Sequence, residues 1–368
     1  MPAYYRPGST DGSCDTSRVR ALGCLIVAGC GRIGFQSGEL AGDAALPDGS
    51  LVAPAIEIVG LDLGAGDPVT RLSVTRLADG SHGLGFTRGQ LSPMLGAIIK
   101  PDASPLGPAP STVSPSGGGA IYTDTSIVWN GTHLLGALEA SDGTTYFKTL
   151  APDLSTFLTF DQFTGRAGNP SFARAGSTWF AGYIDGSAQV LALGGDGRPT
   201  GAPKVFPATP DSLAMIDVGE RALLSMQTGA TCTFSSIDAN LNNATQAIDA
   251  PCTGPHAASD GQDRAFVALV GATGIEIIEV ISSPGIAFAG PFPIGATGRD
   301  PRAAWGTGPR CVMWLDDGIQ FAREGASGFA RGAITNLPAG DPDAWDAIDD
   351  AGFAVYGSTV FRFSPCGA

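Results

Sequence analysis

The sequence is poor in lysine, in histidine and in charge overall. Of its 368 residues, 15% are charged and three are histidines, and the only lysines are Lys100, Lys148 and Lys204. The formal net charge is −14, and no segment is rich in basic residues. A nucleic-acid backbone or an anionic membrane surface would repel such a chain on average. We therefore expect no nucleic acid among its partners.

The sequence also lacks the compact motifs that mark common catalytic and metal sites. The histidines lie far apart in no HExxH or HxH pattern, and there is no GxSxG or P-loop. Two adjacent carboxylate pairs, Asp316-Asp317 and Asp349-Asp350, coincide with turn signals and indicate hairpin turns rather than a glycosidase pair. We expect no cofactor and no metal, and we assign no catalytic residue.

Glycine, proline and apolar residues are abundant instead. The chain has 53 glycines and 27 prolines, and 43% of its residues are hydrophobic. No apolar pattern of period 3.6 is sustained beyond residue 50. Many short apolar segments separated by tight turns indicate an all-β fold.

A repeat of about 45 residues is marked by prolines in a similar setting. These are Pro68, Pro115, Pro170, Pro210, Pro255, Pro301 and Pro342, spaced 40 to 55 residues apart. In the third unit, turn residues separate four candidate strands at 171–175, 178–184, 189–193 and 203–206. Four strands joined by tight turns in each unit predict the blades of a β-propeller. Each repeat proline is then expected in the linker that runs from the outer strand of one blade to the innermost strand of the next, where its missing N–H costs nothing.

The last unit contains only three candidate strands, at 345–348, 352–356 and 359–363. The apolar stretch at 55–63 lies before the first repeat proline and has no partner of its own. Placed as the fourth strand of the last blade, it closes the ring and removes an exposed sheet edge. Seven units then predict seven four-stranded antiparallel blades within residues 51–368.

This pattern resembles the divergent propellers of exported bacterial lipoproteins, and it differs from WD40 repeats because a WD dipeptide is lacking. The resemblance implies a monomeric propeller of the bacterial envelope. Two alternatives stay open. The segment at 101–119, rich in proline and glycine, could be a long loop without a blade boundary, which leaves six blades. A pair of β-sandwiches is the other alternative.

The N-terminal region carries a second pattern. Arg18 and Arg20 precede an apolar run at 21–29, which ends at Cys30 after small residues. The segment at 27–30 resembles the lipobox of bacterial lipoproteins. The resemblance implies a signal peptide over 1–29 with a long lead-in, a lipidated Cys30, and a flexible tether over 30–50. It also implies a periplasmic or cell-surface location, with a lipid anchor at a membrane such as the outer membrane. The alternative is that 25–28 is a buried strand.

Four cysteines remain after the signal and the lipidated residue are set aside: Cys232, Cys252, Cys311 and Cys366. In an exported chain they favour two disulfides over a zinc site, because no CxxC spacing is present. Cys232 and Cys252 flank one candidate hairpin of the fourth unit. We therefore predict that bond, and by elimination a Cys311–Cys366 bond.

Tryptophans and arginines of the first segments of the repeats are the candidate ligand-binding residues. They are Trp129, Arg174, Arg302, Trp305 and Trp345. Around a channel mouth, indoles and guanidiniums can bind a sugar, a peptide or an anionic group. Packing between blades is the alternative. We predict an envelope binding or scaffold module whose partner is a protein or a glycan. The alternative is a carbohydrate-active hydrolase or lyase with a site assembled from distant blades.

Overall fold

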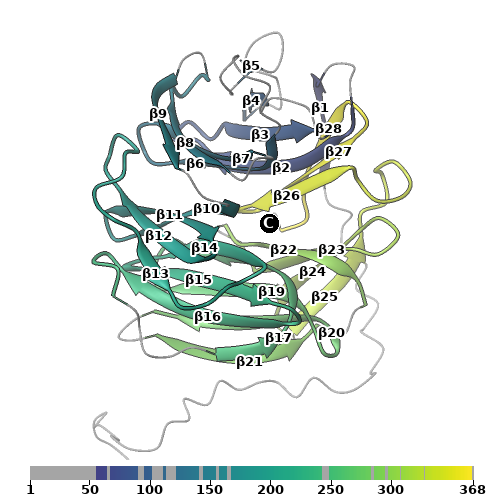
Figure 1. Cartoon of the computed structure of the whole chain (residues 1–368). Coiled ribbons are helices and arrows are strands. Elements are labelled where there is room, and N and C mark those ends of the chain that lie inside the picture. Colours follow the sequence, from purple (N-terminus) through teal and green to yellow (C-terminus); the bar gives the residue numbers. More distant parts are fainter. Residues whose placement is uncertain are drawn as a thin grey trace, which may run out of the picture. The chain divides into compact units, whose positions relative to one another are not determined.

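Seven antiparallel sheets of four strands each follow one another along the described part of the chain in this computed structural model. They form the blades of a seven-bladed β-propeller, which confirms the predicted fold and blade number (Figure 1). The structure describes residues 55–63, 67–89, 95–101, 111–112, 122–140, 144–154, 157–163, 167–242, 248–282, 286–294, 297–306, 308–326 and 328–366. Within these ranges, no helix is long and apolar enough to cross a membrane.

Each of the first three blades runs in chain order from its innermost to its outermost strand. Blade 1 comprises β2 (Val69–Arg76), β3 (His82–Arg88), β4 (Leu95–Ile99) and β5 (Ser111–Thr112). Blade 2 comprises β6 (Tyr122–Trp129), β7 (Leu134–Ala140), β8 (Thr145–Leu150) and β9 (Phe157–Phe163). Blade 3 comprises β10 (Ala167–Ala175), β11 (Thr178–Asp185), β12 (Ser187–Leu193) and β13 (Lys204–Phe206).

The next three blades repeat this order. Blade 4 comprises β14 (Ser212–Val218), β15 (Arg221–Thr228), β16 (Thr231–Asp238) and β17 (Ile248–Pro251). Blade 5 comprises β18 (Thr253–Ser259), β19 (Arg264–Gly271), β20 (Gly274–Ile281) and β21 (Ala287–Pro293). Blade 6 comprises β22 (Arg299–Ala304), β23 (Cys311–Leu315), β24 (Ile319–Gly325) and β25 (Gly328–Ala333).

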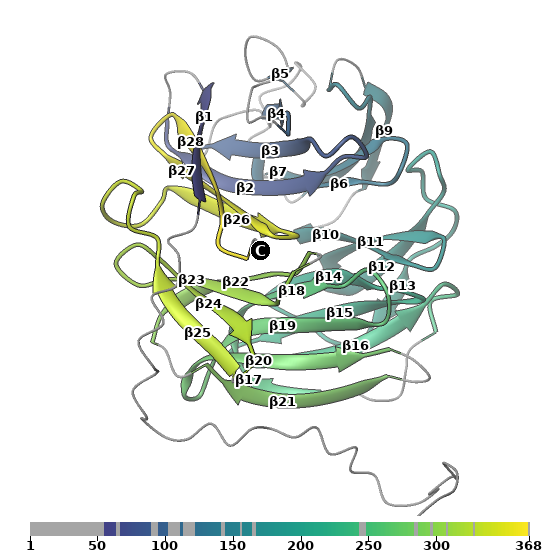
Figure 2. The ribbon, with the colours of Figure 1, turned by 180° about the vertical axis from the view of Figure 1, so that it is seen from behind.

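Blade 7 joins the two ends of the described chain. It comprises β26 (Ala344–Ile348), β27 (Ala351–Tyr356), β28 (Thr359–Ser364) and, as its outermost strand, β1 (Ala55–Asp62). β1 runs antiparallel to β28, with Ala55 opposite Ser364, and Figures 1 and 2 both show the purple β1 beside the yellow β28. The predicted ring closure by the N-terminal strand is therefore confirmed.

The segment at 101–119 contains a blade boundary. Its described residues Ser111 and Thr112 form β5, which pairs with β4 as the outer strand of blade 1, and blade 2 begins at Tyr122. The alternatives of six blades and of two sandwiches were therefore wrong. A two-residue strand gives almost no periodic signal, which is why the sequence left this boundary open.

Six of the seven repeat prolines lie in two settings, and Pro115 lies outside the described residues. Pro68, Pro210 and Pro342 precede the innermost strands of their blades, as predicted. Pro170 and its equivalents in blades 5 and 6 instead lie within the innermost strand, at a shift in register with the second strand. A β-bulge tolerates proline because the bulged residue makes no ladder hydrogen bond. The prediction that every repeat proline lies in a linker was therefore wrong for these three.

The core lies between blades, so the middle strands are buried on both faces. β23 is buried at all five positions, and it shows no alternation of apolar and polar residues. Close approach between blades requires a small residue at Gly182 of β11. A Cβ atom there would lie 2.5 Å from Met215 Sδ of blade 4. The propeller is thus held by side chains that interlock from one blade to the next.

Candidate functional site on the propeller axis

Polar side chains on the innermost strands bind backbone N–H groups of the following blade. Among the described residues, this contact recurs at four of the seven junctions and joins β2 to β6, β10 to β14, β18 to β22 and β26 to β2. The pairs are Ser73 Oγ with Ile127 N (3.0 Å), Thr75 Oγ1 with Trp129 N (2.8 Å), Ser171 Oγ with Met215 N (3.0 Å), His256 Nδ1 with Ala303 N (3.1 Å), and Asp346 Oδ2 with Val74 N (3.0 Å). The axial layer of the propeller is therefore a series of hydrogen-bonded links between strands.

Three of the axial side chains also meet one another. His256 Nε2 lies 3.3 Å from Asp346 Oδ1, and Arg302 Nε lies 3.6 Å from the same oxygen. These residues come from blades 5, 7 and 6. His256 and Asp346 are two blades apart, and they meet because the innermost strands surround a common axis.

Asp300 and Trp345 extend this cluster. Arg302 Nη1 donates to Asp300 Oδ1 at 2.6 Å, and Trp345 Nε1 donates to Asp300 Oδ2 at 2.7 Å. The Arg302 guanidinium lies 5.2 Å from the centre of the Trp345 ring, in cation–π geometry. We call His256, Asp300, Arg302, Trp345 and Asp346 the axial network.

The contacts of the axial network determine its proton positions. Nδ1 of His256 accepts a hydrogen bond from Ala303 N–H, so it carries no proton, and the Nε2 proton faces Asp346. Asp346 accepts from Val74 N–H and faces both His256 and Arg302. The side chains of His256 and Asp346 therefore both contact other innermost strands. A substrate could reach an imidazole nitrogen only if one of these contacts between strands were broken.

A second polar pair lies on the innermost strands of blades 3 and 4. The backbone N–H of Arg174 donates to Asp217 Oδ1, and the Arg174 guanidinium lies 3.7 Å from Asp217 Oδ2. Desolvation raises the pKa of the Asp217 carboxyl to about 6, against the lowering effect of both Arg174 groups. The Arg174 guanidinium also lies 5.9 Å from the Trp179 ring centre, so it contacts both the Asp217 carboxylate and an aromatic ring.

The five candidate ligand-binding residues separate into two groups. Arg302 and Trp345 lie together in the axial network, as described. Trp305 instead packs on Phe266, at 5.9 Å between ring centres, and the guanidiniums of Arg264 and Arg310 lie near its ring. Trp129 packs partly buried against the core between blades 1 and 2. Arg174 pairs with Asp217 on a different part of the innermost strands.

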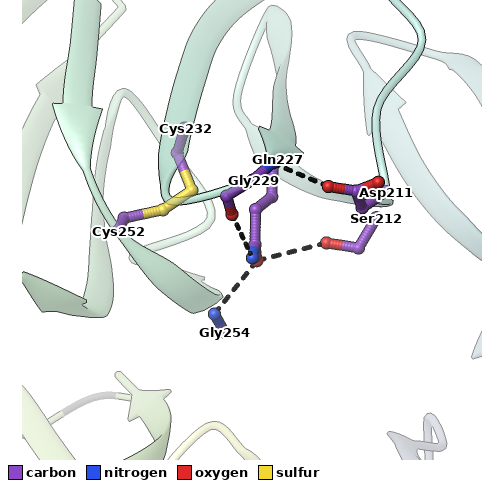
Figure 3. Close-up of a disulfide and its surroundings, with 7 residues drawn as sticks. All are labelled: Asp211, Ser212, Gln227, Gly229, Cys232, Cys252 and Gly254. Atoms are coloured by element: carbon purple, nitrogen blue, oxygen red, sulfur yellow. Dashed lines mark hydrogen bonds between the residues drawn. A yellow bond between two sulfur atoms is a disulfide. The ribbon is translucent and has the colours of Figure 1, made fainter.

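The cysteines of the fourth blade form a disulfide. Cys232 on β16 and Cys252, just after β17, have Cα atoms 5.5 Å apart and are bonded through sulfur. Gln227 lies beside the bond, accepts from Gly254 N–H and donates to Gly229 O, while Asp211 accepts from Gly229 N–H (Figure 3). The bond therefore staples a region where blades 4 and 5 already meet.

Cys311 and Cys366 lie in the same core cluster between blades 6 and 7, as two buried free thiols. Burial raises the pKa of the Cys311 thiol well above its usual range. Their predicted disulfide stays a prediction, and the structure places the two side chains in contact. Cys30, the predicted lipidation site, and the whole of 1–50 lie outside the described residues.

Sequence reasoning missed His256, Asp300 and Asp346. One signal was available for the axial layer: the residue directly after the repeat proline is Ser171, His256 or Arg302 in blades 3, 5 and 6. All three belong to the axial contacts described above. The Asp316-Asp317 and Asp349-Asp350 pairs lie in hairpin turns, as predicted. Among the residues placed by the structure, no group of three or more His, Cys, Asp or Glu side chains could hold a metal ion.

Comparisons with known proteins support the fold only. No protein-family model matches the sequence, and the curated proteins contain no match to it. Solved structures do match. A catalytically inactive histidine-to-alanine variant of virginiamycin B lyase from Staphylococcus aureus, with quinupristin, is 10% identical, with a TM-score of 0.56. That superposition covers 84% of this chain and 99% of the other.

Two further matches are a chain of the mitotic checkpoint complex and the WD40 repeats of RRP9. The first is 13% identical with a TM-score of 0.55, and covers 89% of this chain and 100% of that chain. The second is 13% identical with a TM-score of 0.53, and covers 85% and 99%. At these identities the similarity defines a class, the seven-bladed β-propellers. It assigns neither the chemistry nor the partner of any neighbour to this chain.

Proposed function

We propose that this chain is an exported, lipid-anchored recognition module of the bacterial envelope, whose propeller presents a rigid surface around its axis. The proposal rests on the contacts that His256 and Asp346 make within the axial network. Both nitrogens of His256 face partners, and Asp346 accepts a hydrogen bond from Val74 N–H and lies within 4 Å of His256 Nε2 and Arg302 Nε. Three other blades therefore contact this carboxylate. Such an arrangement fixes the positions of polar groups for binding, and it provides no free acid–base pair.

The proposed location is supported by sequence and by one covalent bond. The N-terminal region carries the basic flank, the apolar run and Cys30 in lipobox order. The Cys232–Cys252 disulfide suits a protein that folds in an oxidising compartment. The tether at 30–50 would let the propeller reach a partner away from the membrane. A net charge of −14 argues against nucleic acid as that partner.

The anchor is tested by metabolic labelling with an alkyne fatty acid, comparing the wild type with Cys30→Ser. We expect the wild type to be labelled, to lack residues 1–29 by mass spectrometry, and to sediment with membranes. Cys24→Ser is the matched control and should behave like the wild type. An intact Met1, or equal sedimentation of Cys30→Ser and the wild type, would contradict the anchor.

Recognition is tested by photo-crosslinking in intact cells. We call the exposed surface around the axial network the axial surface. A photoreactive residue at position 299 probes it, because Arg299 precedes Asp300 in sequence and its side chain is 64% exposed. The control position is Val205, which is 56% exposed on the outermost strand β13. We expect one discrete envelope protein or glycan adduct from position 299 and none from position 205. Identical adducts from both positions would show that the axial surface has no role in recognition.

A second candidate is a propeller enzyme, such as a carbohydrate-active hydrolase or lyase. The contact between His256 and Asp346 favours it, since histidine–carboxylate pairs serve in acid–base catalysis. Turnover of an envelope polysaccharide or peptide panel, abolished by His256→Gln while the variant remains folded, would establish this candidate and overturn the first. We expect no such turnover, because substrate access to either nitrogen requires the loss of a link between strands.

A further inference from the structure

A cavity of about 120 Å³ lies between blades 4 and 5, next to the axial layer. Its walls come from the two innermost strands of each blade, β14 and β15 on one side and β18 and β19 on the other. Ser171, Met215, Pro255 and His256 line it where the innermost strands of blades 3, 4 and 5 approach one another. The cavity thus adjoins the axial network through His256.

Strand register shows which side chains face the cavity. In blade 4, Ala214 lies opposite Ser225 and Ile216 lies opposite Leu223, and all four line the cavity. Directly paired residues of antiparallel strands project from the same face of the sheet. Blade 5 contributes the facing pair of Ala257 and Val267. These facing pairs of blades 4 and 5 are therefore aliphatic apart from Ser225, while Ser171 and His256 add polar groups where the cavity adjoins the axial layer.

The junction between blades 4 and 5 is joined at its two ends. At one end Gln227 Oε1 accepts from Gly254 N–H at 3.2 Å, and at the other Ser282 Oγ donates to Val218 O at 3.1 Å. Between these bonds, no hydrogen bond among the described residues of β14 and β18 corresponds to the links that Ser73, Ser171, His256 and Asp346 make elsewhere. The cavity occupies the part of the junction where such a link would lie.

Ser225 is the polar residue lining this cavity whose side chain has no hydrogen-bond partner. Its residue is 3% exposed, and its Oγ has no hydrogen-bond partner in the structure. A buried hydroxyl without a partner is unfavourable, so a native fold normally supplies it with a protein, water or ligand partner. The second hydroxyl at the cavity, that of Ser171, already accepts from Met215 N–H and retains its own proton to donate.

We propose that this cavity binds a small neutral ligand group with a compact aliphatic body and one oxygen acceptor, which receives the Ser225 O–H. The volume suits such a group, since an apolar cavity of about 150 Å³ in another protein holds benzene. No Asp, Glu, Lys or Arg side chain lines the cavity, and both ring nitrogens of His256 face partners outside it. A charged group would lose its hydration there without compensation, which restricts the ligand to neutral molecules or side chains. The inference rests on the proposed binding function and gives it a ligand class.

The test uses the full chain with two probes of the same ring size, cyclopentanone and cyclopentane. Methyl NMR follows Ile216, Leu223 and Val267, which line the cavity. We expect both probes to shift these methyl signals, with cyclopentanone binding more tightly. In Ser225→Ala, we expect cyclopentanone to bind about fivefold more weakly, as for the loss of one hydrogen bond, and cyclopentane to be unaffected.

The control is Ser235→Ala, which removes another buried hydroxyl without a partner from the same blade. Ser235 lies on β16 opposite Leu224, away from the cavity walls, and its loss should change neither affinity. Ala257→Val fills the cavity and should abolish both shifts.

Equal affinities of the two probes in the wild type and in Ser225→Ala, or a cavity holding only water in a crystal soaked with cyclopentanone, would overturn the inference. These outcomes are distinct from failure of the proposed function, because membrane anchoring and turnover are measured separately. If the cavity bound cyclopentanone and the chain also proved to be an enzyme, the cavity inference would stand and the recognition proposal would be wrong.

Discussion

His256 Nε2 and Asp346 Oδ1 lie 3.3 Å apart, although one residue belongs to blade 5 and the other to blade 7. Each side chain also binds the backbone of a following blade, through Ala303 N–H and Val74 N–H respectively. One contact therefore couples four blades, including the blade that closes the ring. The axial network therefore joins blades. It also holds polar groups in fixed positions where a ligand could contact them.

Loss of charge at Asp346 should destabilise the propeller. Asp346→Asn keeps an acceptor for Val74 N–H but removes the charge that faces Arg302, and we expect a loss of about 2 kcal/mol in the free energy of unfolding. Asp349→Asn is the matched control, since Asp349 pairs with the half-exposed Arg76 and should cost less than about 1 kcal/mol. Urea unfolding monitored by circular dichroism gives both values. Equal losses in the two variants would contradict the role of the axial contact.

His82 should make stability depend on pH. Burial, with smaller effects of Arg362 and Arg76, lowers the pKa of His82 to about 4, from 6.5 in the unfolded chain. The unfolded state therefore binds the proton first, and the contribution of His82 is full above pH 6.5 and is lost as pH falls toward 4. Between pH 7 and pH 5 we expect a loss of about 2 kcal/mol from this residue.

The measurement compares urea midpoints of the wild type and His82→Gln at the two pH values. The comparison isolates His82 from other titrating groups, such as Asp217, whose raised pKa favours the folded state at acid pH. A His82 imidazole that titrates near pH 6.5 in an NMR experiment on the folded protein would show that burial does not set its pKa.

The disulfide of blade 4 should contribute directly to stability. Its two cysteines are 20 residues apart in sequence, and a loop of that size predicts about 3 kcal/mol of stabilisation through the unfolded chain. The double variant Cys232→Ala/Cys252→Ala should lower the unfolding free energy by that amount. In a Cys311→Ala/Cys366→Ala background, which removes the other predicted bond, mild reduction should give the same loss, and reduction should have no effect once all four cysteines are replaced. A reductant effect that persists without these four cysteines would show that the loss does not come from the blade 4 disulfide.

Cys311 and Cys366 are expected to form the second disulfide in the exported protein. A non-reduced digest should contain one peptide linking β23 to the region after β28, which would staple blade 6 to the closing blade. Labelling of denatured protein by a thiol reagent should then detect neither cysteine. Two labelled thiols in protein purified from the envelope would show that the pair stays reduced.

Trp345 should be needed for both packing and the axial network. It is 4% exposed and donates its indole N–H to Asp300. Trp345→Phe keeps most of the apolar volume, and we expect a loss of about 1 to 2 kcal/mol from the hydrogen bond and the smaller ring. Trp305→Phe is the control, because the Trp305 indole N–H donates no hydrogen bond to any of the described residues. Thermal unfolding compares the two variants. A larger loss in Trp305→Phe would contradict this assignment.

Much of the fold could be predicted from local patterns. The spacing of prolines and turns placed the blades, and the unpaired stretch at 55–63 identified the closing strand, because an unpartnered edge strand is unfavourable. The Cys232–Cys252 bond also followed from local pattern, since both residues belong to one hairpin. The bulges at Pro170, Pro255 and Pro301 could not be predicted, because register depends on the neighbouring strand and not on the proline alone.

The sequence by itself determined the repeat, the number of strands in each unit and the way the ring closes. The reason is that the spacing of apolar segments, prolines and turn residues can be read along the chain. Only the tertiary structure decided which side chains face the axis and which pack between blades. Trp305 and Trp345 occupy similar places in sequence, yet one packs on Phe266 and the other binds Asp300. The contacts of His256 and Asp346 come from other blades, and Ser225 faces a cavity between two blades, so only the assembled ring defines the surroundings of these side chains.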